Sequence, residues 1–323
     1  MTIKEQLRGL LEENRGSFIS GEIIAKRLYC TRGAVWKAIK ALRSEGLEIT
    51  AITNRGYCLN DSGDILSESG IRSNLSRECD VFVLKSVNST NAFLRGLAQS
   101  GAEEGTLVLA CEQTNGCGRR GRKFFSPADT GIYMSILLRP GFSAQEAVKI
   151  TAAAAVAVCL AVEKTLDISL NIKWVNDIYL NDKKVAGILT EASMNIENGL
   201  LDYAVVGIGL NVYNPENGYP PEISGIAGAQ LKERLPITRN KLAAEIYNNF
   251  MDLYEKLPEN IFLEEYQKRL MWKNERIFVL SGADGKVKTP AVMLGVDESC
   301  ALKVRYDDNS EGIISSGEIS IRR

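Results

Sequence analysis

The chain has 323 residues, 45% of them hydrophobic and 24% charged, which is typical of a soluble globular protein of roughly two or three domains. Its formal net charge is −1, so contact with nucleic acid would depend on a local basic patch. No apolar run is long enough to span a membrane, and the first residues lack the apolar segment of a signal peptide. We therefore expect a cytoplasmic protein without a membrane partner.

The absence of histidine restricts the chemistry. It excludes a Ser–His or Cys–His nucleophile pair, a histidine base and a histidine metal ligand within this chain. The seven cysteines are scattered and include no C-x-x-C pair, so we expect neither a disulfide framework nor a zinc site. Any reaction must rest on Lys, Arg, Asp, Glu, backbone amides or a recruited metal ion.

Residues 1–60 have the pattern of a winged helix-turn-helix. Thr2 with Glu5 predicts a capping box, and Ser20 and Thr31 predict the starts of two further helices. A hairpin, the wing, is predicted to follow and to turn at residues 54–56. Ten cations against six anions give this segment a net charge of +4, which favours DNA binding over a module that only packs against its neighbour. The predicted DNA-contacting residues are Arg32, Trp36, Lys37 and Arg55.

The rest of the chain predicts an α+β fold. A polar break at 61–64 is a candidate linker. Predicted strands cover 81–84, 106–110, 132–138, 168–174, 178–180, 184–190 and 202–210, and predicted helices start at 92 and cover 145–165, 238–257 and 259–270. The last four strands form an antiparallel meander, which favours a mixed sheet with helices on one face. Short strands from residue 277 predict a small SH3-like β-barrel, so the expected domains are 1–64, 65–272 and 273–323.

Residues 116–123 form the most informative stretch, because three glycines and four cationic side chains fall within eight residues. Helices and strands both disfavour such glycines, so this is a predicted loop. It could clamp a phosphate or carboxylate, or it could be a solvated basic loop. It formally matches G-x-G-x-x-G, but Pro127 blocks the helix that a dinucleotide fingerprint requires, and Arg122-Lys123 breaks the Walker pattern.

Two further features leave alternatives open. Ser89 and Thr90 stand where a predicted strand meets a predicted helix, so their hydroxyls could bind a ligand or cap the helix. Lys184 begins an apolar strand, near Lys173 and Asp177, and could pair with an anionic ligand or be a solvated edge lysine.

Three motifs together resemble the biotin–protein ligases, and with residues 1–60 they resemble the bifunctional form that is also the biotin operon repressor. The motifs are residues 113–124 (QTNGCGRRGRKF), 173–177 (KWVND) and 184–189 (KVAGIL), in the family's order. Cys117 stands where the family has Arg and Val175 where it has Pro, so the loop of this chain has one cation fewer.

The resemblance implies a two-step acyl transfer, in which biotin and ATP form biotinyl-5′-AMP and a lysine of biotin carboxyl carrier protein then takes the biotin. It implies that Arg119 and Lys184 are catalytic and that biotin is held by Ser89, Thr90, Asn91, Gln113, Gly116, Cys117, Gly118, Arg119 and Lys184. ATP or the adenylate would contact Arg119, Arg120, Arg122, Lys173, Asn176, Asp177 and Asn211, with Asp177 at Mg²⁺. The adenylate would act as corepressor, so that a homodimer binds operator DNA. A repressor without ligase activity and a lipoate–protein ligase remain the alternatives.

Overall fold

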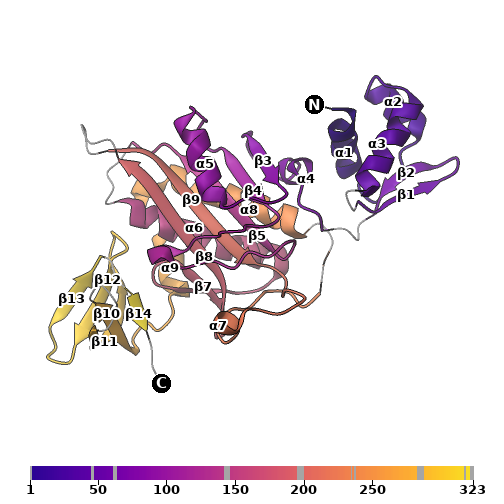
Figure 1. The fold of residues 1–323 in the computed structure, drawn as a ribbon. Helices are drawn as coiled ribbons and strands as arrows, with labels where there is room; N and C mark the ends of the chain where they lie inside the picture. The colour runs from indigo at the N-terminus through magenta and orange to yellow at the C-terminus, as the bar shows by residue number, and fades with distance from the viewer. Residues whose placement is uncertain are drawn as a thin grey trace.

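The computed structural model describes residues 2–44, 47–60, 64–141, 146–194, 200–233, 235, 238–281, 287–315 and 318–320. The predicted linker therefore lies outside the described residues except for Asp64, as does the first residue of the helix predicted at 145–165. Figure 1 shows the N-terminal and C-terminal elements on opposite sides of a central sheet. Among the described helices, none is both long and apolar enough to cross a membrane.

The N-terminal part is a winged helix-turn-helix with its own core. Its elements are α1 (Ile3–Glu13), α2 (Gly21–Arg27), α3 (Arg32–Ser44) and the antiparallel strands β1 (Ile49–Ile52) and β2 (Gly56–Leu59). The predicted caps are confirmed: Thr2 forms a capping box with Glu5, and Ser20 and Thr31 accept bonds from the amides of Ile23 and Ala34. Leucine, isoleucine and valine side chains from all three helices pack into a core separate from that of the central sheet.

The central part is built on a seven-stranded sheet of order β3-β4-β5-β9-β8-β7-β6. Only β3 and β4 are parallel, so the predicted mixed sheet is confirmed. The strands are β3 (Val81–Leu84), β4 (Leu107–Ala110), β5 (Gly131–Leu138), β6 (Asn171–Lys173), β7 (Asp177–Leu180), β8 (Lys183–Met194) and β9 (Leu201–Asn211). The helices are α4 (Glu68–Arg72), α5 (Thr90–Gln99), α6 (Ala147–Leu166), α7 (Pro221–Ser224), α8 (Thr238–Glu255) and α9 (Leu263–Arg269), with 3₁₀ turns at Arg119–Gly121 and Leu257–Glu259.

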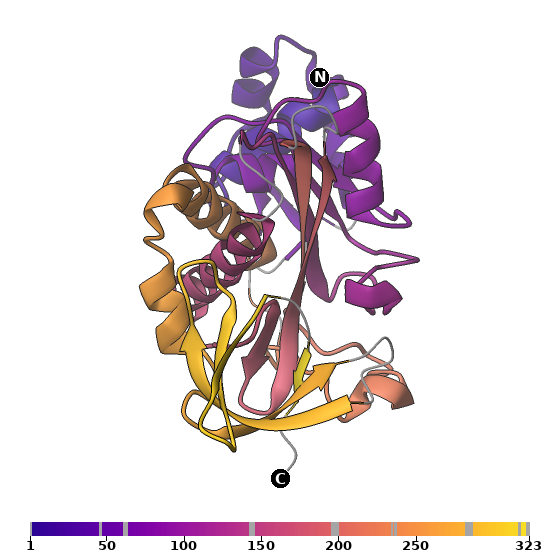
Figure 2. The ribbon, with the colours of Figure 1, turned by 90° about the vertical axis from the view of Figure 1, so that its left-hand side faces the viewer.

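Helices cover both faces of this sheet, which corrects the expectation that they lie on one face. The Ala-rich α6 is buried around most of its circumference, and it packs with α8 and α9 on one side. Leu94 and Ala98 of α5 pack on the other side, against Val108, Leu137 and Val205. Figure 2 shows the sheet nearly edge-on with helices to its left and right. The sequence pattern did not indicate which face α5 would cover, because side chains of a strand alternate and both faces of β5 are apolar.

The C-terminal strands form an open five-stranded sheet of order β13-β12-β11-β10-β14. They are β10 (Arg276–Ser281), β11 (Val287–Val296), β12 (Leu302–Tyr306), β13 (Glu311–Ile314) and β14 (Glu318–Ser320). The predicted barrel is therefore not closed among the described residues, because the short end strands β13 and β14 each pair with one neighbour only. The buried side chains of this sheet are continuous with the central core, so the boundary at 272/273 stays a prediction.

A buried ion pair fixes the point where the chain enters the central part. Asp64 Oδ2 lies 3.1 Å from Arg239 Nε, and Asp64 Oδ1 accepts a 2.8 Å bond from the Arg239 amide. Tyr213, just after β9, donates a 2.6 Å hydrogen bond to the same carboxylate. The side chains of Asp64 and Arg239 are 0% and 1% exposed, so Asp64 depends on Arg239 for charge compensation, while Arg239 also lies 3.4 Å from the more exposed Asp129 carboxylate.

Candidate active site

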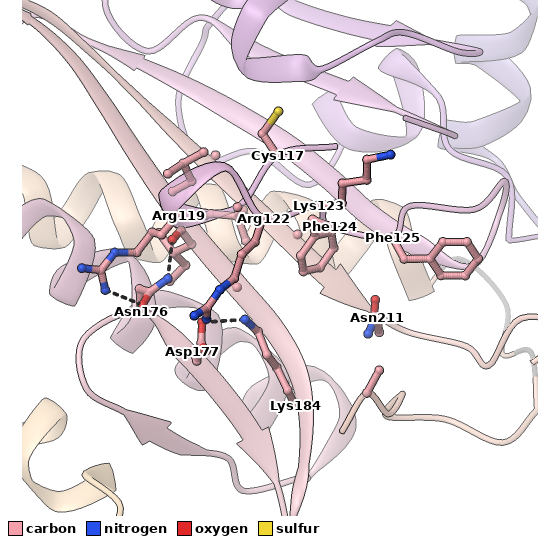
Figure 3. A pocket seen from close by; sticks show the side chains of 18 of the residues that line it. Cys117, Arg119, Arg122, Lys123, Phe124, Phe125, Asn176, Asp177, Lys184 and Asn211 are labelled. Carbon is pink, nitrogen blue, oxygen red and sulfur yellow. Dashed lines mark hydrogen bonds and ion pairs between the residues drawn. The ribbon is translucent and has the colours of Figure 1, made fainter. Parts of the chain in front are cut away.

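One cavity of about 350 Å³ gathers most of the residues that the sequence singled out. It lies between the start of α5, the 113–125 loop, strands β6 to β9 and residues 219–227. Figure 3 shows Arg119 and Arg122 extending from the loop toward Asn176, Asp177 and Lys184. The predicted ligand-binding residues on its wall are Ser89, Thr90, Asn91, Gln113, Cys117, Gly118, Arg119, Arg122, Lys173, Asn176, Asp177, Lys184 and Asn211.

The 116–123 loop folds back on itself as a small hairpin. Gly118 donates its amide to the Arg122 carbonyl at 2.7 Å, and Phe124 donates to the Gly116 carbonyl at 2.9 Å. Arg120 sits at the tip with a left-handed φ of 56° and is exposed. Neither Gly116 nor Arg120 lines the cavity: a Cβ on Gly116 would meet the Phe124 carbonyl, and Arg120 lies on the outer turn. The loop thus presents Arg119 and Arg122, but not Arg120, to the cavity.

Glycines form the floor of the cavity, and sequence reasoning missed them. Gly207 and Gly209 are two residues apart on β9, so they lie on the same face of the sheet, and Gly187 of β8 pairs with Gly209. A Cβ on Gly207 would lie 2.2 Å from Asn91 Oδ1, and one on Gly209 would lie 2.4 Å from the Phe124 ring. The usable signal was two glycines at a spacing of two inside an apolar strand, which marks a close approach by another group.

Two ordered pairs occupy the cationic side of the cavity. Arg119 Nη1 donates a 3.0 Å bond to Asn176 Oδ1, and the Asn176 amide donates to the Ile188 carbonyl at 2.9 Å. Lys184 Nζ lies 2.7 Å from Asp177 Oδ1, and both side chains are partly buried. Strand β8 lies between β9 and β7, so Lys184 is not on an edge strand. The structure therefore excludes the alternative that Lys184 is a solvated edge lysine.

The opposite end of the cavity is polar and almost fully buried. Ser89 caps α5 by accepting a bond from the Ala92 amide and also lines the cavity, so both predicted roles are compatible. Gln113 Oε1 accepts from the Thr90 amide at 2.9 Å, and Gln113 Nε2 donates to Ser126 at 3.0 Å. This end therefore offers fixed donors and acceptors to a polar, uncharged ligand group.

Tyr179, Tyr219 and Trp174 also line the cavity. Burial raises the pKa of Tyr179 to about 12, assisted by the charge of Asp177, and burial raises the pKa of Tyr219 to about 12. Both phenols are therefore neutral near pH 7. Behind the site, Trp174 donates to the Cys300 carbonyl at 2.9 Å, which attaches the cavity wall to the C-terminal sheet. The described residues contain no cluster of three or more acidic or cysteine side chains that could hold a metal ion.

The predicted DNA-contacting side chains are all on the surface. Arg32, Trp36 and Lys37 of α3 are exposed, and 56% of Trp36 is accessible. The Lys40 ammonium lies 5.6 Å from the centre of the Trp36 ring. At the wing, the Arg55 guanidinium lies 4.3 Å from the centre of the Phe18 ring. α3 therefore presents a basic and aromatic outer face.

This fold and site define a ligase domain joined to an N-terminal helix-turn-helix. Residues 83–211 match the Biotin/lipoate A/B protein ligase family, and residues 4–58 match an HTH domain. The bifunctional ligase/repressor BirA of Bacillus subtilis is 40% identical over 229 residues, 70% of each chain. The Escherichia coli BirA is 29% identical over 95% of this chain and 94% of that protein.

Solved structures agree with this assignment. The biotin protein ligase of Aquifex aeolicus, in complex with biotin and ATP, superposes with a TM-score of 0.61 at 27% identity. The match covers 76% of this chain and 99% of that one. This protein therefore belongs to the biotin–protein ligase family, in the bifunctional ligase/repressor form.

Proposed function

We propose that this protein joins biotin to ATP, transfers the biotin to a lysine of biotin carboxyl carrier protein, and represses biotin genes in response to the adenylate. The observation that carries the proposal is the composition of the cavity described above. It combines a polar, uncharged end, a floor of glycines and a cationic side. Biotin has the matching parts: a ureido group, a thin ring system and a carboxylate.

The first step joins two anions. A biotin carboxylate oxygen attacks the α-phosphorus of ATP, a P–O bond forms, and the bond to pyrophosphate breaks. Negative charge builds on the pentavalent phosphorus, so ordered cations lower the barrier. We assign Arg119 and Lys184 to this role, and the contacts that hold them at the cavity wall, with Asn176 and Asp177, support the assignment. Arg122 and Lys173, also on the wall, would contact the phosphates, and Asn211 the adenylate.

The second step needs the adenylate to survive until the carrier arrives. The lysine amine of the carrier attacks the acyl carbon of the mixed anhydride, an amide forms, and AMP leaves. The loop carrying Arg119, with Phe125 edge-on to Tyr219 at a centroid distance of 6.4 Å, would exclude water from the anhydride. Cys117 and Gly118, also on the wall, would border the biotin.

A magnesium ion would accompany the nucleotide. Mg²⁺ commonly takes one or two carboxylates together with substrate phosphates, and Asp177 supplies a single carboxylate on the cavity wall. The donor set therefore fits an ion carried in by ATP, and such an ion would neutralise charge on the phosphates.

The DNA-binding role rests on the N-terminal module. Its net charge of +4 and the exposed Arg32, Trp36, Lys37 and Arg55 suit a palindromic operator bound by a homodimer. The adenylate would favour this dimer by binding its protomers more tightly than the free monomer. Cytoplasmic location stays a prediction.

Biotin-dependent exchange of pyrophosphate into ATP tests the ligase. We expect wild-type exchange and a loss on the order of 10²-fold or more in Arg119→Ala, because that guanidinium would stabilise transition-state charge. The matched control is Arg276→Ala on the C-terminal sheet, whose ion pair with Asp307 is 70% and 57% exposed. Wild type without exchange would leave a sensing repressor, and exchange driven by lipoate instead of biotin would identify a lipoate ligase.

A biotin-dependent gel shift on a palindromic operator fragment tests repression. We expect Arg32→Ala to abolish the shift at moderate salt, because each lost phosphate contact lowers affinity and the salt dependence. The Arg276→Ala control should shift as wild type does. An unchanged shift for Arg32→Ala would contradict the placement of α3 on DNA.

A further inference from the structure

Lys173, one of the cations on the cavity wall, lies over an aromatic ring that is not part of that wall. Its ammonium is 5.3 Å from the centre of the Trp272 ring, within the range at which a cation is attracted to the face of an aromatic ring. Lys173 lines the cavity, whereas Trp272 does not. Any effect of this ring on a ligand must therefore pass through the lysine.

The backbone fixes the position of the ring beside β6. Leu270 forms a parallel bridge with Ile172, and the Met271 amide donates to the Ile172 carbonyl at 2.8 Å. The residues that follow on the two segments, Trp272 and Lys173, are therefore neighbours. The contact between them is a consequence of this register.

The C-terminal sheet holds the turn that carries the ring. The Asn274 amide donates to the Met293 carbonyl of β11 at 2.7 Å, and the Glu275 amide donates to the Trp272 carbonyl at 2.9 Å. Within this turn Trp272 has a φ of 68°, in the left-handed region that a bulky residue rarely adopts. Its side chain also packs against the core that the C-terminal sheet shares with the central part. Trp272 is thus fixed by the C-terminal part of the chain.

Lys173 lies at the edge of the central sheet. It pairs with Asp177 across β6 and β7, and β6 is the last strand of the sheet. Three strand spacings of roughly 4.8 Å separate β6 from β9, so Lys173 lies about 14 Å from the glycine floor. A nucleotide with its α-phosphorus near Arg119 and Lys184 would extend its β- and γ-phosphates toward this edge.

We propose that Trp272 is a positioning residue that holds the Lys173 ammonium for the β- and γ-phosphates of ATP, so that the C-terminal sheet contributes to nucleotide binding. This inference rests on the proposed function. The ring attracts one side of the ammonium, and the N–H donors on its other side remain available to phosphate oxygens. A lysine that is already held loses less rotamer freedom when the nucleotide binds.

The main test removes the ring with Trp272→Leu. We expect the KM for ATP in biotin-dependent pyrophosphate exchange to rise about fivefold, the size of one cation–π contact. The kcat should stay within about twofold, because the contact is made before the reaction begins. Trp272→Phe keeps an aromatic face and should hold the KM within about twofold of wild type. Trp272→Met fills the space without a ring, should raise the KM as leucine does, and covers the case in which the leucine variant does not fold.

Two comparisons test the route. Biotinyl-5′-AMP lacks the β- and γ-phosphates, so Trp272→Leu should leave its dissociation constant, measured by displacement of biotin, within about twofold. In Lys173→Met the ammonium is gone, so Trp272→Leu should raise the KM for ATP by less than about twofold further. The matched control is Gln267→Ala, which removes a 3.5 Å bond from α9 to the Val296 carbonyl of the C-terminal sheet. That bond does not involve Lys173, so the control should leave the KM within about twofold of wild type.

Three results would overturn the inference: an unchanged KM for ATP in both Trp272→Leu and Trp272→Met, an equal weakening toward biotinyl-5′-AMP, or an effect of Trp272→Leu that persists in Lys173→Met. A wild-type protein without biotin-dependent exchange would instead refute the proposed function, so the two failures are distinguishable.

Discussion

Replacing Gly209 by alanine tests whether the glycine floor positions the arginine loop. The new Cβ would lie 2.4 Å from Phe124 Cε1, whereas ordinary contact begins near 3.4 Å. The ring must therefore move by about 1 Å, and Phe124 is bonded through its amide to Gly116 at the base of the loop. A displacement of that size in a positioned catalytic group costs roughly 10²-fold in rate. We expect kcat/KM for pyrophosphate exchange to fall by about that factor.

The fold should tolerate the same change. Phe124 is only half-buried, so the free energy of unfolding, from urea titration, should fall by less than about 1 kcal/mol. The matched control is Gly96→Ala in α5, where a Cβ meets nothing within 4 Å. It should leave exchange unchanged and stabilise the protein by about 0.5–1 kcal/mol.

A double-mutant cycle identifies the cause. If the clash is responsible, Gly209→Ala should have little further effect once Phe124→Ala has removed the ring. Exchange within about threefold of wild type in Gly209→Ala would refute the reasoning, because a displaced loop is expected to cost far more. Additive losses in the double variant would refute it as well.

Two further predictions concern the ion pair of Asp64 and Arg239. Asp64→Asn leaves the buried Arg239 guanidinium with only the half-exposed Asp129 carboxylate, 3.4 Å away, so we expect the free energy of unfolding to drop by about 3 kcal/mol. The control Asp252→Asn, whose pair with Arg77 is exposed, should cost less than about 1 kcal/mol, and equal losses would contradict this. Burial, with Asp64 adding to it, raises the pKa of Tyr213 from 10.0 to about 12. The unfolded phenol therefore ionises first, and this stabilisation, complete below about pH 10, is lost as the pH rises through about 12. Tyr213→Phe should show a shallower decline of stability over that window in urea titrations, and an identical decline would contradict the assignment.

Local signals made the N-terminal helices predictable. A cap needs only a side chain and an amide three residues away, and Thr2, Ser20 and Thr31 supply such pairs. The proximity of Lys184 to Asp177 could also be predicted, because the two residues belong to adjacent strands joined by a short turn.

Features that depend on distant pairing were not predictable from one sequence. The Asp64–Arg239 pair joins residues 175 positions apart, and nothing near either residue marks its partner. The pairing of Gly187 with Gly209 follows from the register of β8 on β9, which is set after both strands are assembled. For the same reason, the sequence alone could not predict that the C-terminal sheet is open or which face of the central sheet α5 covers.

Asn176, just before β7, and Asp177, the first residue of β7, give Arg119 and Lys184 different partners. Arg119 pairs with the neutral amide of Asn176, while Lys184 pairs with the carboxylate of Asp177. When Arg119 turns to a phosphate it leaves no charge uncompensated, so its full positive charge is available to an incoming anion. When Lys184 does so it releases a carboxylate, which a cation bound to the nucleotide can then use. Before the substrates bind, Asp177 thus keeps Lys184 ordered and also compensates its positive charge. This asymmetry is why we assign the larger share of charge stabilisation to Arg119.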